Sequence, residues 1–147
     1  MILVDTPIWS LALRRRRADL DARERRHVRE WERIVRGGMI ALIGPIRQEL
    51  LSGVREEETS ERLRTALRPF VDVPISTEDY ETASLFFNRC RSRGVTESAI
   101  DLLICAVSSR IAAPIYTTDS DFRRYAEVLG LRLHHAVRSR HAATRQT

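Results

Sequence analysis

The chain has 147 residues, enough for one domain with a sizeable core, and 43% of them are hydrophobic while 31% are charged. No apolar run is long enough to span a bilayer, and the two cysteines form neither a C-x-x-C pair nor a zinc-like cluster with the histidines. The net charge is +5 and all 25 basic residues are arginines, which excludes any catalytic lysine and suits recognition of phosphate or RNA.

Short apolar runs alternate with helical patterns along the chain. We predict strands at Met1–Val4, Met39–Ile43, Phe70–Val73, Pro114–Thr117 and, as a possible fifth, Leu131–His135. We predict helices over Ile8–Arg15, Leu20–Arg36, Ile46–Ser52, Glu56–Arg68, Ser76–Arg93, from Ser98 onward, and Ser120–Leu129. This alternation indicates an α/β fold with a short parallel sheet of four to five strands covered on both faces. The domain is expected to span residues 1–135, followed by a basic, flexible tail at 136–147.

Acidic residues follow three of the predicted strands. Asp5 comes after the first strand and Glu49 lies shortly after the second. Asp119 and Asp121 follow the fourth, and Asp101 stands near the start of the helix that leads into it. Because ligands of open α/β sheets bind at the carboxyl ends of the strands, these acids share one pocket if the three strands are neighbours.

Each of these acids also has an ordinary structural explanation. Asp5 could cap a helix, Asp101 could complete a capping box, and Asp119 could form an Asx-turn. Asp121 could sit at a helix start, and Glu49 could be a surface residue. Taken together, however, carboxylates without basic partners repel one another and raise their own pKa values, which a divalent cation would relieve. Mg²⁺ and Mn²⁺ prefer such oxygen ligands, and the resulting site suits phosphodiester hydrolysis without a Ser or Cys nucleophile.

Four segments, in order, resemble the PIN-domain ribonucleases, and more narrowly the VapC-type toxins of type II toxin–antitoxin systems. They are LVDTPIWS (Leu3–Ser10), GPIRQELLSGV (Gly44–Val54), SAIDLLICAV (Ser98–Val107) and TTDSDF (Thr117–Phe122), and the overall match covers about Met1 to His135. The resemblance implies a three-layer α/β/α PIN-like domain that acts as an Mg²⁺- or Mn²⁺-dependent endoribonuclease. It also implies an RNA substrate, a cognate VapB-type antitoxin, a homodimer, and a heterotetramer or larger assembly with the antitoxin.

The resemblance also implies roles for individual residues. The catalytic acids would be Asp5, Glu49, Asp101 and Asp119, and the metal ligands would be Asp5, Asp101, Asp119 and Asp121. Thr118 would support them, and Thr6 and Ser10 are weaker candidates for the same supporting role. Two stretches depart from the family pattern: Arg14–Arg36 is longer and more basic, and Val95–Ser98 is only loosely similar. Both departures bear on substrate geometry, and neither includes a carboxylate of the quartet.

An arginine cluster and the chain start complete the sequence predictions. Arg14, Arg15, Arg16 and Arg17, with nearby Arg23, Arg25 and Arg26, are candidate RNA contacts, but a solvated helix face with ion pairs explains them equally well. No signal peptide is expected, because the Met1–Val4 run has no basic segment before it and ends at Asp5, so the expected compartment is the cytoplasm.

Two other functions remain to be weighed. An aspartyl-phosphate mechanism is disfavoured because Pro7 occupies the place of its second acid and lysine is absent. The remaining alternative is a catalytically inactive PIN-like module that binds RNA or protein. Metal binding and RNA cleavage discriminate it from an active nuclease.

Overall fold

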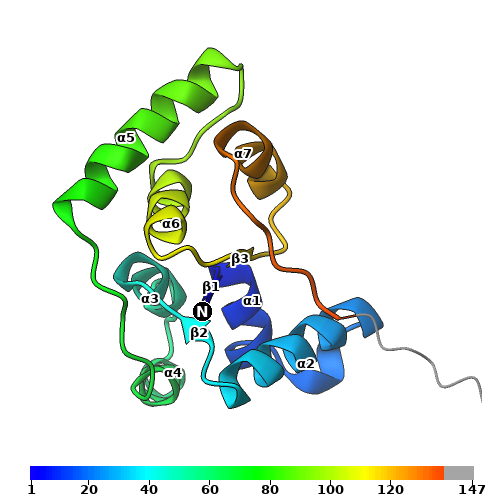
Figure 1. Cartoon of the computed structure of the whole chain (residues 1–147). Coiled ribbons are helices and arrows are strands. Elements are labelled where there is room, and N and C mark those ends of the chain that lie inside the picture. Colours follow the sequence, from blue (N-terminus) through cyan, green and yellow to red (C-terminus); the bar gives the residue numbers. More distant parts are fainter. Residues whose placement is uncertain (138–147) are drawn as a thin grey trace, which may run out of the picture.

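Three short parallel strands form the centre of the protein in the computed structural model, which describes residues 1–137 (Figure 1). They are β1 (Ile2–Val4), β2 (Ile40–Ala41) and β3 (Ile115–Tyr116), in the order β2-β1-β3. Leu3 of β1 lies opposite Ala41 on one side and Ile115 on the other. The first strand is therefore the central one, and its residues are all buried.

The sheet has three strands instead of the four to five predicted from the sequence. The segments predicted as strands at Phe70–Val73 and Leu131–His135 each form only an isolated parallel bridge, Leu42 with Asp72 and Ile115 with Leu133. Pro69 and Pro74 enclose the first segment and lack the N–H that a longer ladder requires, so Val73 alone donates to Leu42. The second segment pairs with β3, whose two residues offer little backbone to extend along.

The helices predicted from the sequence are confirmed, with ends displaced by a few residues. They are α1 (Thr6–Leu13), α2 (Ala22–Arg36), α3 (Gly44–Leu51), α4 (Glu57–Leu67), α5 (Thr77–Ser92), α6 (Ala99–Arg110) and α7 (Asp121–Leu129). A 3₁₀ turn, η1 (Arg17–Asp19), joins α1 to α2. Capping boxes start two helices, Asp21 with Glu24 at α2 and Ser76 with Asp79 at α5.

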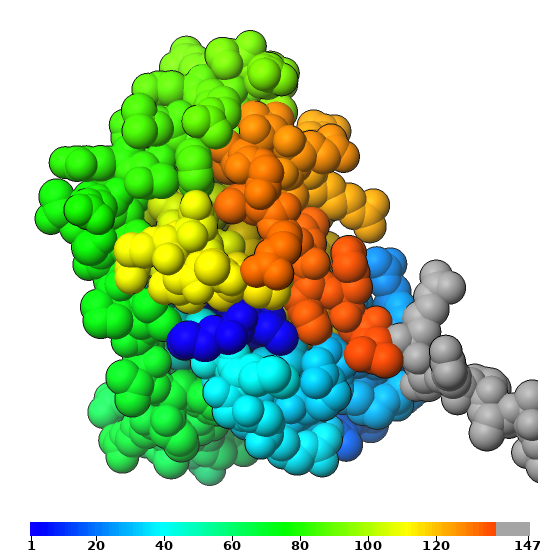
Figure 2. All heavy atoms as spheres, in the orientation of Figure 1, coloured from blue at the N-terminus to red at the C-terminus, as the bar shows by residue number. Residues whose placement is uncertain are grey.

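Two groups of helices enclose the strands. Figure 1 shows α5, α6 and α7 above the strands and α2 and α4 below them; α5 packs on α6 and α7, while α1 packs on α2 and α3. In Figure 2 the first residues of the chain, in blue, fill a seam between yellow and cyan segments, which are the region of α6 and β3 and the region of β2. Burial of β1 from both sides fixes the position of the residue that follows it, Asp5.

The core is apolar and aromatic. Trp9 of α1 is fully buried and makes edge-to-face contacts with Trp31 and Phe70, as expected for packing residues. Residues 102–108 of α6 are all buried, so this helix is the most enclosed of those described.

Two features concern the limits of the domain. The predicted tail at 136–147 lies outside the described residues except for Ala136 and Val137. Among the described helices, none combines the length and the apolar character that crossing a membrane requires.

Candidate active site

Asp5 lies at the carboxyl end of the central strand and caps α1. One carboxylate oxygen accepts the backbone N–H of Thr6 at 2.8 Å, and the other accepts the hydroxyl of Thr117 at 2.7 Å. The residue is only 5% exposed. The helix-cap explanation offered by the sequence is therefore confirmed, but Asp5 also contacts the loop after β3, which a cap alone does not require.

The loop after β3 carries a short chain of hydrogen bonds that ends at two further acids. Thr117 accepts the backbone N–H of Asp119 at 3.0 Å, and Asp119 accepts the backbone N–H of Asp121 at 2.9 Å. The second bond is the Asx-turn expected at Asp119, and it leads directly into α7. Thr117 thus links Asp5, which follows β1, to Asp119 in the loop after β3.

Glu49 reaches the same edge from α3, which follows β2. Its carboxylate accepts the hydroxyl of Thr6 at 2.6 Å. Two hydrogen bonds are consistent with the supporting role predicted for Thr6: it donates its backbone N–H to Asp5 and its hydroxyl to Glu49. Glu49 itself is exposed, whereas Asp5 is buried.

Asp101 approaches from the first turn of α6 and contacts a tyrosine that the sequence did not reveal. The hydroxyl of Tyr125, on α7, lies 3.4 Å from Asp101 and 3.2 Å from the backbone carbonyl of Thr96. The capping-box explanation for Asp101 is wrong, because the side chain of Ser98 makes no capping hydrogen bond. Asp101 is instead half-buried and held beside the other acids.

Electrostatic effects show that the acids are neighbours. Burial raises the pKa of Asp5 to about 6 against the opposing hydrogen bonds from Thr117 and Thr6, and repulsion from Glu49 and Asp119 adds to the rise. Burial also raises the pKa of Asp101 to about 6, with repulsion from Asp5 and Asp119 as the next causes. Asp121 contributes further to the rise at Asp101. The strand order therefore brings the predicted acids of three strands to one edge of the sheet.

The donor set of this edge consists of carboxylate oxygens, the ligands that Mg²⁺ and Mn²⁺ prefer. Within residues 1–137, none of these carboxylates is in an ion pair with an arginine or histidine, so no cationic side chain there pairs with them to offset their repulsion. In the same part of the chain, no three His, Cys, Asp or Glu side chains stand in the arrangement of a ready-made metal site. The chemistry of the donors fits a divalent cation, and the carboxylates would have to draw closer around it.

Other predicted residues lie elsewhere or make no contact with the acids. Thr118 is exposed, and neither it nor Ser10 makes a side-chain hydrogen bond to another described residue, so their supporting roles remain predictions. Thr117, which makes the contacts to both aspartates, was missed by sequence reasoning. The register explains why: Val4 lies opposite Tyr116, so the next residues along, Asp5 and Thr117, emerge side by side.

The run of four arginines lies at the end of α1 and in η1, away from the acids. Arg14, Arg15 and Arg16 line a groove of about 500 Å³ with residues of α4. Arg15 and Arg17 form ion pairs with Glu24 and Glu32, as the solvated-face explanation expects. RNA contact by this cluster remains a prediction.

The fold and this edge together define an open-sheet α/β domain with carboxylates gathered at the carboxyl ends of its strands. A family model for the PIN domain matches residues 2–128, and the chain belongs to the PIN domain family. No curated protein sequence matches the chain.

Solved structures with the same fold include FitAcB from Neisseria gonorrhoeae, with a TM-score of 0.73, 18% identity, and coverage of 92% of this chain and 98% of that one. VapBC2 from Rickettsia felis, bound to a DNA fragment from its promoter, has a TM-score of 0.71 and 19% identity, and the match covers 91% of this chain and 98% of that one. A toxin–antitoxin complex from Klebsiella pneumoniae has a TM-score of 0.60 and 19% identity, and the match covers 83% of this chain and 90% of that one. These similarities show a shared fold.

Proposed function

We propose that this protein is a metal-dependent endoribonuclease and the toxin of a type II toxin–antitoxin pair. The observation that carries the proposal is the cluster of unpaired carboxylates at the sheet edge, two of which, Asp5 and Asp101, have raised pKa values. PIN domains are generally nucleases, and similar solved structures are toxin–antitoxin complexes, which supports the proposal. A toxin that cleaves cellular RNA would act in the cytoplasm.

Asp5, Asp101 and Asp119 would hold Mg²⁺ or Mn²⁺, with Asp121 as a further ligand. The ion would supply an activated water and stabilisation of the leaving oxygen of a phosphodiester. The protein's own part is positioning: the Thr117 hydroxyl orients the Asp5 carboxylate and accepts the backbone N–H of Asp119, which fixes the loop that carries Asp119. Thr6 holds one oxygen of Glu49, so that the other oxygen can accept a hydrogen bond from the attacking water.

The proposed partners are an antitoxin of the VapB type and a second copy of the chain. Large apolar side chains exposed on α5 and α6, Tyr80, Leu85 and Ile100, support a protein interface on that side of the molecule. Light scattering of the purified protein, alone and with a candidate VapB-type antitoxin, tests for a dimer and for a larger complex. A monomer in both samples would contradict this assembly.

RNA cleavage by matched variants tests the enzymatic proposal. Asp5→Asn and Asp101→Asn should keep the fold but abolish Mg²⁺- or Mn²⁺-dependent cleavage of RNA, because each loses a charged ligand. Asp19→Asn, which neutralises an exposed carboxylate in η1, is the control and should cleave like the parent protein. Mapping the 5′ ends of cellular RNA after induction, with parent and Asp5→Asn compared, would identify the target.

Two results would overturn the assignment. Cleavage by Asp5→Asn at the parent rate would place the active site elsewhere. RNA binding by the parent without cleavage at millimolar Mn²⁺, and without any rise in melting temperature, would favour the inactive binding module.

A further inference from the structure

A second feature of the surface is a basic pocket of about 480 Å³ that adjoins the acids at Asp119. One wall is α2, another is the end of β3 with the loop Thr117–Ser120, the third is the start of α7, and the fourth is the segment Leu133–Ala136. The volume lies within the range of small-ligand sites and is large enough for a nucleotide. The segments that form the pocket are far apart in the sequence, so the pocket exists only in the folded chain.

The pocket is positively charged. Arg23 and Arg26 line it from α2 and Arg123 lines it from α7, while Asp119 is the one carboxylate among its lining residues. None of the three arginines is in an ion pair with another described residue. The Nε atom of Arg26 is buried and has no hydrogen-bond partner within residues 1–137. These guanidinium groups therefore retain donors and charge for an external anion.

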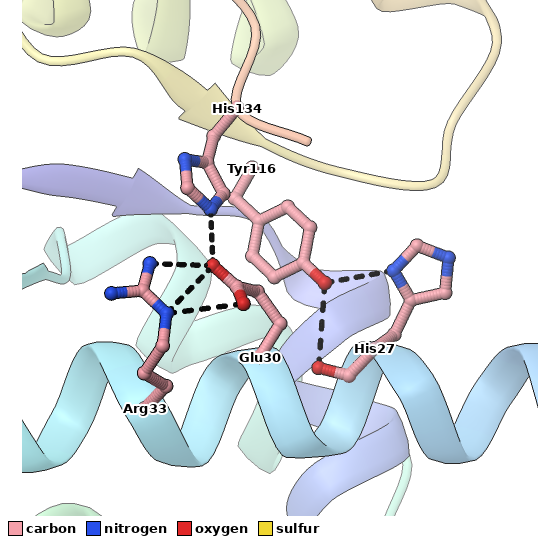
Figure 3. A network of polar contacts seen from close by, with 5 residues as sticks. All are labelled: His27, Glu30, Arg33, Tyr116 and His134. Carbon is pink, nitrogen blue, oxygen red and sulfur yellow. Dashed lines mark hydrogen bonds and ion pairs between the residues drawn. The ribbon is translucent and has the colours of Figure 1, made fainter. Parts of the chain in front are cut away.

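A network of polar contacts holds α2 against the end of the sheet beside this pocket (Figure 3). Glu30 of α2 is 5% exposed and accepts hydrogen bonds from Arg33, the closer at 2.7 Å, and lies 2.7 Å from a ring nitrogen of His134. His27, also on α2, lies 2.8 Å from the hydroxyl of Tyr116 on β3. These contacts fix the helix that presents Arg23 and Arg26 to the pocket.

The positive charge of the pocket also affects the pKa of a neighbouring histidine, His27. Burial lowers the pKa of His27, and the charges of Arg23 and Arg26 lower it further. His27 is among the residues that line the pocket, and its Nε2 atom is buried with no partner among the described residues. A bound anion would offset the field of the two arginines.

We propose that this pocket binds the phosphate of a nucleotide next to the scissile bond, so that a single-stranded RNA runs from the acid cluster past Asp119 into the pocket. The inference rests on the proposed nuclease function and adds the path of the substrate. Phosphate is favoured over a protein segment because the unpaired groups are guanidinium donors, with the hydroxyls of Thr118 and Ser120 at the same wall. Joined by Asp119, the two sites would hold successive phosphates of one strand.

Binding of a fluorescent single-stranded RNA, followed by anisotropy in EDTA so that no cleavage occurs, tests the proposal. The double variant Arg23→Ala/Arg26→Ala should weaken binding by about tenfold or more. The negative slope of log K against log salt should also become shallower by about 1.4, since each of the two lost phosphate contacts to a single strand contributes about 0.7. The charge-matched control is Arg29→Ala/Arg36→Ala, because both arginines are exposed on the same helix and neither lines the pocket.

A second pair of variants covers the case in which the α2 double variant does not fold, as circular dichroism would show. Arg123→Ala should weaken binding, whereas Arg124→Ala, an exposed neighbour on α7 that does not line the pocket, should not. Equal losses in pocket and control variants would mean general electrostatic attraction and overturn the proposal, as would no loss in either.

Failure of the pocket is distinguishable from failure of the nuclease. If Asp101→Asn abolishes cleavage while the pocket variants bind RNA like the parent, the function stands and the pocket assignment is wrong. If the pocket variants lose RNA binding while the parent shows no metal-dependent cleavage, the pocket is an RNA site of a non-catalytic protein.

Discussion

Replacing Asp5 by Asn should stabilise the metal-free protein while abolishing its activity. Burial and the neighbouring acids raise the pKa of Asp5 from 3.8 to about 6, so at neutral pH the folded state holds an ionised carboxylate in an unfavourable place. A difference of about two pKa units corresponds to about 3 kcal/mol. Asparagine keeps the shape, an oxygen for the Thr6 N–H and an amide N–H that can donate to the Thr117 hydroxyl oxygen, and it removes the charge.

The sign and pH dependence follow from linkage. Because the folded pKa lies above the unfolded one, the penalty is absent below about pH 3.8, grows as the pH rises, and is complete above about pH 6. Asp5→Asn should therefore gain about 3 kcal/mol over the parent at pH 8 and about half of that at pH 5.

Urea denaturation in EDTA measures this difference. For a slope of about 2 kcal/mol per molar urea, the midpoint of Asp5→Asn should exceed that of the parent by about 1.5 M at pH 8. Asp19→Asn should show no such gain, because its carboxylate is exposed and lies outside the cluster. A gain that is absent, or that is equal at pH 8 and pH 5, would refute the electrostatic reasoning.

Three further predictions concern metal binding and the contacts around the site. Mn²⁺ at a hundred times its Kd should stabilise the protein by about 2.7 kcal/mol. At a fixed Mn²⁺ concentration the stabilisation should be greater at pH 7.5 than at pH 5.5, because protons compete with the metal for carboxyl groups whose pKa values are raised. Calorimetry should find no such stabilisation in Asp101→Asn. Thr117→Val should lose about 1–3 kcal/mol and most of the cleavage rate, since both its hydrogen bonds to the aspartates disappear, whereas Thr118→Val should be nearly neutral in urea denaturation; equal losses would contradict the assigned contacts. Glu30→Gln should cost about 1.5–3 kcal/mol because this buried side chain loses the charge to which Arg33 donates, while Glu32→Gln, at a surface ion pair, should cost less than about 1 kcal/mol.

Much of the local structure could be predicted from the sequence. Each predicted helix is present, because apolar spacing, capping residues and the Gly and Pro stops are all local signals. The strands predicted at Phe70–Val73 and Leu131–His135 form only single bridges. For the second of them the reason is that β3, its partner, has only two residues with which to pair. The sequence pattern shows where a strand can form, and the backbone of the adjacent segment in the fold decides whether it does.

The sequence by itself determined which residues could serve the site: Asp5, Glu49 and Asp119 follow apolar runs, and their proximity to strand ends is readable along the chain. Only the tertiary structure decided that they meet. The order β2-β1-β3 places β1 in the middle, and its register with β3 sets Thr117 beside Asp5, although 112 positions separate them.

The same holds for Tyr125 and for the basic pocket, where α2 meets β3, α7 and the segment after it. Such contacts depend on how strands and helices from distant parts of the chain pack around a common core. No periodicity within a single segment encodes that packing.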